Sequence, residues 1–147
     1  LEEQFGSSAG PLAQEYVVAH EYGHALQDQL GLLGRAQQGQ TGPDSGAVRI
    51  ELMADCLGGV WAHHATTVKD PDTQTPFLEP LTEQDIKDAL SAASAVGDDS
   101  IQQKTQGRVT PENWTHGSAE ARQRWFLQGF RTGDLNQCDT FAVASVN

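Results

Sequence analysis

The chain has 147 residues and a formal net charge of −11, from 20 acidic and 9 basic side chains. Apolar residues make up 37% and charged residues 20%, a composition that supports one folded core and excludes a disordered chain. The acidic balance argues against binding to nucleic acid or to an anionic membrane surface. The sequence has no run of about 18 apolar residues, so it predicts no membrane-spanning helix within this segment.

Four helices are predicted along the chain from apolar residues that recur at spacings of three and four. Strand-like alternation is scarce, and residues 141–146 are the one weak candidate for a strand. The helices are expected at 11–31, 47–67, 82–97 and 118–133, with loops over 34–46 and 69–81 and a polar link after the third helix. The sequence therefore predicts a mainly α-helical chain that forms a single domain.

Glycines in the middle of the first two predicted helices indicate close helix packing. Gly23 interrupts the first helix, where glycine costs about 1 kcal/mol relative to alanine. Gly58 and Gly59 interrupt the second helix in the same way. We expect this cost to be offset by the close approach of the first two helices to each other.

The first helix carries His20, Glu21 and His24 in the pattern H-E-x-x-H. Residues four apart lie on one face of a helix, so the imidazoles of His20 and His24 can reach one metal ion. Glu21 is turned to the next stripe, where it can contact a metal-bound water without being a ligand. This combination is typical of hydrolytic zinc sites. The alternative is a pair of surface histidines beside an unrelated glutamate.

A catalytic zinc site needs a third protein ligand, and the second helix offers two carboxylates on one face, Glu51 and Asp55. They are either solvated surface charges or buried groups that need a partner or a metal. Their neighbours are apolar, which favours the buried position. We therefore expect Glu51 to be the third ligand and Asp55 to accept the N–H of a ligand imidazole, that of His20.

Two cysteines, Cys56 and Cys138, are far apart in the sequence. Their spacing alone allows either one disulfide or two free buried thiols. A disulfide closing a loop of this length would restrict the unfolded chain by roughly 4 kcal/mol in the chain-entropy model.

The segments that contain these residues resemble a bacterial family of neutral zinc metallopeptidases. The similarity covers roughly residues 5–141 and is carried by His20-Glu21-Tyr22-Gly23-His24, Arg49-Ile50-Glu51-Leu52-Met53-Ala54-Asp55-Cys56, Gly97-Asp98-Asp99, Thr115-His116-Gly117 and Cys138-Asp139-Thr140-Phe141. The resemblance implies a mainly α, zincin-like metallopeptidase catalytic core whose N-terminal sheet lobe is largely missing from this chain. It also implies that residues 1–147 are one domain of a longer precursor with an N-terminal membrane anchor.

The order of these motifs is similar to the gluzincin pattern. It implies one zinc ion per chain, held by His20, His24 and Glu51, with Glu21 as general base for hydrolysis of a peptide or protein substrate. His116 is a candidate donor to the oxyanion, although it is equally well explained as a loop histidine that packs near the fourth helix. An alternative function is a zinc-binding helical scaffold without peptidase activity.

The resemblance also favours one of the two states of the cysteines. With it, we expect a disulfide between Cys56 and Cys138, which would attach the carboxyl-terminal tail to the helix that carries Glu51. Disulfides persist in oxidising compartments, so an extracytoplasmic location is expected, either secreted or anchored through a segment outside this chain.

Overall fold

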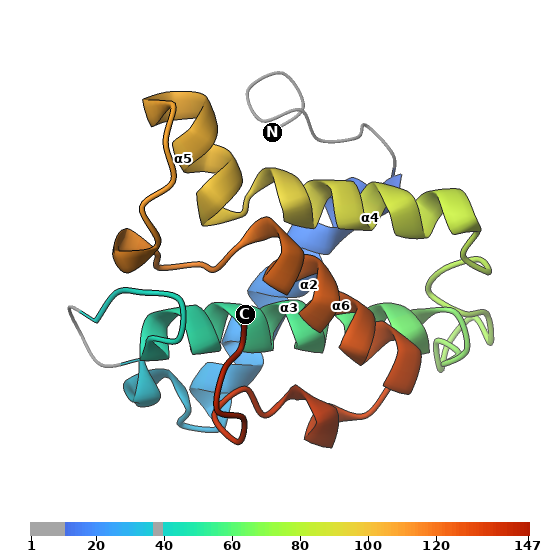
Figure 1. The fold of residues 1–147 in the computed structure, drawn as a ribbon. Coiled ribbons are helices and arrows are strands. Elements are labelled where there is room, and N and C mark those ends of the chain that lie inside the picture. The colour runs from blue at the N-terminus through green and yellow to red at the C-terminus, as the bar shows by residue number, and fades with distance from the viewer. Residues whose placement is uncertain (1–10, 37–39) are drawn as a thin grey trace.

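A computed structural model describes residues 11–36 and 40–147 (Figure 1). The first ten residues and part of the loop predicted over 34–46 lie outside the described residues. The helices are α2 (Pro11–Gln29), α3 (Gly46–Ala65), α4 (Glu83–Ala95), α5 (Asp98–Gln106) and α6 (Ala119–Thr132), with short 3₁₀ turns η1 (Leu33–Arg35), η2 (Pro111–Asn113) and η3 (Leu135–Cys138). The fold is mainly α-helical, as the sequence predicts. In the described ranges, strand pairing is limited to one isolated bridge between Lys69 and Pro76.

The largest apolar core joins α2, α3, α4 and α6; in Figure 1, the axes of α3 and α4 are nearly parallel and α2 passes behind both. Its buried members are Leu12, Ala13, Tyr16, Ala62, Ala89, Ala92, Ala93 and Phe126. Alanine supplies most of the α4 surface in this core, so α4 can lie close to its neighbours. Of the helices that the structure describes, none has the length and apolar content needed to cross a membrane.

Helix α3 lies between α2 and α6, and glycines allow both contacts. A Cβ atom on Gly23 of α2 would lie 2.9 Å from the carbonyl oxygen of Ala54 in α3. On the other side, a Cβ atom on Gly129 of α6 would lie 1.8 Å from the carbonyl oxygen of Cys56. The expected close approach of α2 to α3 is therefore present, but the neighbouring glycines Gly58 and Gly59 of α3 face two different helices. Gly58 faces α2, whereas Gly59 faces the backbone of Phe126 in α6.

Helix α5 forms where the sequence predicted only a polar link. Gly97 is its N-cap, and Gly107 ends it in the left-handed conformation with φ of 69°. None of its residues is buried. The first half of α5 is half-buried and its second half exposed, and Ile101 is its one apolar residue, so no apolar residues recur in it at a spacing of three and four.

The carboxyl-terminal tail packs against α3 without forming a strand, so the weak prediction of a strand over 141–146 is wrong. The Arg49 side chain donates hydrogen bonds to the carbonyl oxygens of Val143 and Ala144, at 2.8 and 2.9 Å. Val146 is fully buried in a second apolar cluster. These contacts use tail carbonyl groups that a strand would have paired with another strand.

A disulfide joins Cys56 of α3 to Cys138 of η3, with Cα atoms 5.5 Å apart. The tail is therefore attached to the same helix that carries Glu51 and Asp55.

Candidate metal centre

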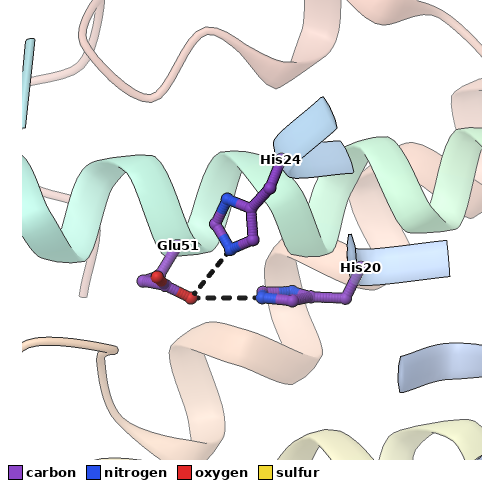
Figure 2. Close-up of side chains that lie close together, drawn as sticks. All are labelled: His20, His24 and Glu51. Carbon is purple, nitrogen blue, oxygen red and sulfur yellow. Dashed lines mark hydrogen bonds and ion pairs between the residues drawn. The ribbon is translucent and has the colours of Figure 1, made fainter. Parts of the chain in front are cut away.

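His20 and His24 of α2 point toward Glu51 of α3 (Figure 2). The Nε2 atom of His20 lies 3.1 Å from Oε2 of Glu51, and the Nε2 atom of His24 lies 3.4 Å from the same oxygen. One donor atom from each residue lies within 4.8 Å of the other two. Two imidazole nitrogens and one carboxylate oxygen are ligands that zinc prefers, so these residues fit a zinc ion.

Local helix geometry and one close packing contact produce this convergence. His20 and His24 are one turn apart, and their ring centroids are 4.6 Å apart. Gly23 lies between them and lets the backbone of α3 approach at Ala54. Glu51 is three residues before Ala54 on α3, so this contact brings Glu51 opposite the two imidazoles.

The electrostatics of the three residues keep Glu51 negatively charged. Burial works to raise the pKa of Glu51, but hydrogen bonds from His20 and His24 outweigh it and hold the pKa well below its usual range. Burial works to lower the pKa of His20, but hydrogen bonds to Asp55 and Glu51 outweigh it and raise the pKa to about 9. The two shifts reflect the attraction between the imidazoles and the carboxylates of Asp55 and Glu51, and the negative charge of Glu51 also favours a cation.

Each imidazole is oriented by a buried partner at its other nitrogen. Nδ1 of His20 lies 2.9 Å from Oδ1 of Asp55, the contact expected for Asp55. Nδ1 of His24 lies 2.8 Å from Oε1 of Gln27, which is itself fully buried. An Nδ1–H that donates to an oxygen leaves Nε2 as the nitrogen with a lone pair. Without a metal the Nε2–H groups donate to Glu51, and when a metal replaces those protons both Nε2 lone pairs are on the side of Glu51.

Gln27 was not predicted as a site residue, although it follows His24 by three positions on the same helix. Its amide nitrogen donates a 2.8 Å hydrogen bond to the carbonyl oxygen of Ile50. The side chain thus connects a histidine of α2 to the backbone of α3 beside Glu51. The only indication of this role in the sequence was the position of Gln27 three residues after His24, on the same face of the helix.

Replacing Gln27 with methionine is expected to raise the zinc dissociation constant about tenfold, because His24 loses the acceptor that fixes its tautomer. Competition with a chromophoric chelator measures this constant. Gln14→Met is the matched control, because Gln14 is exposed on the same helix. Equal zinc affinity in the Gln27 variant and the wild type would contradict an orienting role.

The three residues open onto a pocket of about 400 Å³. Glu21 and His116 also line this pocket, so the structure brings together the two residues predicted to be catalytic. Glu21 is exposed on the surface of α2, one residue after His20. The remaining lining residues are Tyr16, Val17, Val96 and Arg122.

His116 is held at the pocket by Asp98. One carboxylate oxygen of Asp98 accepts hydrogen bonds from the backbone N–H groups of Thr115, His116 and Gly117, at 2.8, 2.7 and 2.9 Å. Its other oxygen lies 3.6 Å from Nδ1 of His116. This contact with Asp98 raises the pKa of His116 above its usual value. The two short segments that contain Asp98 and His116 therefore form one structural unit.

Comparison with known proteins agrees with this geometry. The family model described as "Putative neutral zinc metallopeptidase" matches residues 1–141. The chain belongs to this family.

Relatives in the family are similar along nearly the whole chain. The uncharacterized protein Rv2575 of Mycobacterium tuberculosis is 62% identical over 146 residues, which cover 99% of this chain and 50% of the relative. The uncharacterized protein YpfJ of Escherichia coli is 41% identical over 146 residues, which cover 96% of this chain and 47% of the relative. The chain thus spans about half the length of the curated relatives it matches. No solved structure gives a significant match.

In this member of the zinc metallopeptidase family, two further side chains contact Asp55. Tyr16 of α2 donates its hydroxyl hydrogen to Oδ1, and Arg122 of α6 donates from Nε to Oδ2 at 2.8 Å. Burial works to raise the pKa of Asp55, but the charge of Arg122 outweighs it and holds the pKa below its usual value. Neither residue was predicted as part of the site. Tyr16 was expected in the core, and no pattern in the sequence connects Arg122 with Asp55.

Proposed function

We propose that the protein is a zinc-dependent peptidase, with His20, His24 and Glu51 as the zinc ligands and Glu21 as the general base. The observation that supports this proposal is the convergence of the three donor atoms at a pocket that Glu21 also lines. Family membership supports the same chemistry. Peptides or proteins are the proposed substrates.

A zinc ion at this site would supply a Lewis acid that lowers the pKa of a water molecule towards 7 and polarises the substrate carbonyl. Glu21 would accept one proton from the attacking water and transfer it to the leaving amine as the C–N bond breaks. His116 would donate a hydrogen bond to the carbonyl oxygen as negative charge develops there. Asp55 and Gln27 would keep His20 and His24 in the tautomer that the ligand role requires.

Metal analysis combined with cleavage of a mixed peptide library tests the proposal. We expect bound zinc in a 1:1 ratio with the chain, peptide cleavage that stops after chelation, and recovery when zinc but not magnesium is restored. Zinc binding without cleavage would instead support the zinc-binding helical scaffold. A chain that takes up no zinc would contradict both functions.

We also propose that the protein acts outside the cytoplasm. The Cys56–Cys138 disulfide supports this location, because such bonds persist in oxidising compartments and are rare where thiols are kept reduced.

A further inference from the structure

The carboxylate of Asp55 in α3 is buried where α2 and α6 pack against this helix. The side chain is 0% exposed and receives groups from α2 and α6. Arg122 donates to both of its oxygens, from Nε to Oδ2 at 2.8 Å and from Nη2 to Oδ1 at 3.1 Å. The third nitrogen of Arg122, Nη1, donates to the carbonyl oxygen of Val96 at the end of α4, at 3.1 Å. The guanidinium of Arg122 is thus hydrogen-bonded to the end of α4 through Nη1 and to Asp55 through Nε and Nη2.

This two-point contact restrains the orientation of the Asp55 carboxylate. A carboxylate bound through one oxygen can rotate about the bond to its Cβ atom. Two parallel N–H···O bonds from one planar guanidinium fix the plane of the carboxylate as well as its position. Oδ1 of this carboxylate lies 2.9 Å from Nδ1 of His20. The guanidinium of Arg122 is thus connected to the His20 imidazole through the Asp55 carboxylate, whose Oδ1 also accepts the hydroxyl hydrogen of Tyr16.

We propose that Arg122 is a positioning residue of the metal centre: it fixes the Asp55 carboxylate that orients His20, and in this way it sets the affinity of the centre for its metal. The proposal rests on the proposed function, because it takes His20 as a metal ligand. Arg122 lines the pocket, but its hydrogen-bonding groups are directed to Asp55 and Val96. Its Nη2 atom lies 3.5 Å from Nδ1 of His20, and both of these nitrogens contact Oδ1 of Asp55 more closely, at 3.1 and 2.9 Å. Arg122 therefore acts through Asp55.

A merely structural role for Arg122 makes a different prediction. Arg122 is 4% exposed and connects α3, α4 and α6, so its loss could lower the free energy of unfolding. A residue that only joined helices would leave the metal affinity of the folded protein unchanged. A positioning residue changes that affinity even when the protein stays folded.

The test compares Arg122→Lys with the wild type and with Arg124→Lys as a matched control. Lysine keeps the positive charge that compensates Asp55 but cannot form the two parallel hydrogen bonds. Arg124 is exposed on the same helix and donates instead to the carbonyl oxygen of Val146. Circular dichroism establishes folding, chelator competition measures the zinc dissociation constant, and the visible absorption of the Co²⁺ form reports the ligand geometry.

We expect Arg122→Lys to raise the zinc dissociation constant about tenfold and to alter the Co²⁺ spectrum, with no change for Arg124→Lys. Arg122→Met, which keeps the length of the stem, serves the same purpose if the lysine variant does not fold. Wild-type zinc affinity in a folded Arg122 variant would overturn the positioning role and leave the proposed function intact. If the wild type bound neither zinc nor Co²⁺, both would be overturned.

A double-mutant cycle tests the route through Asp55. In an Asp55→Asn background, Arg122→Lys is expected to change the zinc dissociation constant by less than about twofold, because the oriented carboxylate is already lost. A tenfold effect that persists in that background would show that Arg122 acts independently of Asp55 and would overturn the proposal.

Discussion

Replacing Glu21 with glutamine is expected to lower the rate of peptide hydrolysis by roughly 10²- to 10⁴-fold and to leave the zinc affinity unchanged. Glu21 lines the pocket beside His20 and His24 but is outside the group of three residues that could hold the metal. Glutamine keeps the size of the side chain and loses the ability to accept a proton at neutral pH. Measurement of kcat/KM and of the zinc dissociation constant on the same preparation separates the two effects.

Glu15→Gln provides the matched control for this variant. Glu15 lies on the same helix and is not among the residues that line the pocket, so its replacement is expected to leave both quantities unchanged. A Glu21→Gln protein with wild-type kcat/KM would contradict the role of general base. Loss of zinc together with activity would indicate that Glu21 is a ligand.

Removal of the disulfide is expected to lower the free energy of unfolding by about 4 kcal/mol. Cys56 and Cys138 are 82 residues apart, so the bond closes a long loop and restricts the unfolded chain. Both cysteines are also buried, at 0% and 2% exposure, and replacement by alanine avoids placing a hydroxyl group in that apolar cluster. Denaturant unfolding of the Cys56→Ala, Cys138→Ala double variant measures the change.

A reducing agent should act on the wild type as the double variant does. We expect reduction to lower the unfolding midpoint of the wild type and to have no effect on the variant that lacks both cysteines. Mass spectrometry that finds two free thiols in natively purified protein would contradict the disulfide and, with it, the support for an extracytoplasmic location.

Most of the helical fold could be predicted from local pattern. The four helices with an apolar face, α2, α3, α4 and α6, lie close to the predicted ranges because burial imposes a spacing of three and four on their sequences. Helix α5 buries none of its residues, so that pattern is absent from it. The tail over 141–146 has a weak strand-like alternation but does not form a strand. Its residues are held by contacts with α3, such as those of Arg49, that no local alternation encodes.

The candidate site also has features that local sequence predicts and features that only the tertiary structure reveals. His20 with His24, and Glu51 with Asp55, could be paired in advance because each pair lies on one helix. The pairing of the cysteines came from the family resemblance, since their spacing allowed either state. Gln27 has an ordinary place on its helix, and only its contact with His24 identifies it as part of the site.

The sequence by itself determined which side chains share a helix face, because the rise and turn of a helix follow from local backbone geometry. That was enough to predict the two imidazoles and the carboxylates of the candidate metal centre. Only the tertiary structure decided which faces meet. Arg122 reaches Asp55 across 67 residues because small side chains allow α2, α3 and α6 to pack closely, and close packing between distant segments leaves no periodic pattern in the sequence.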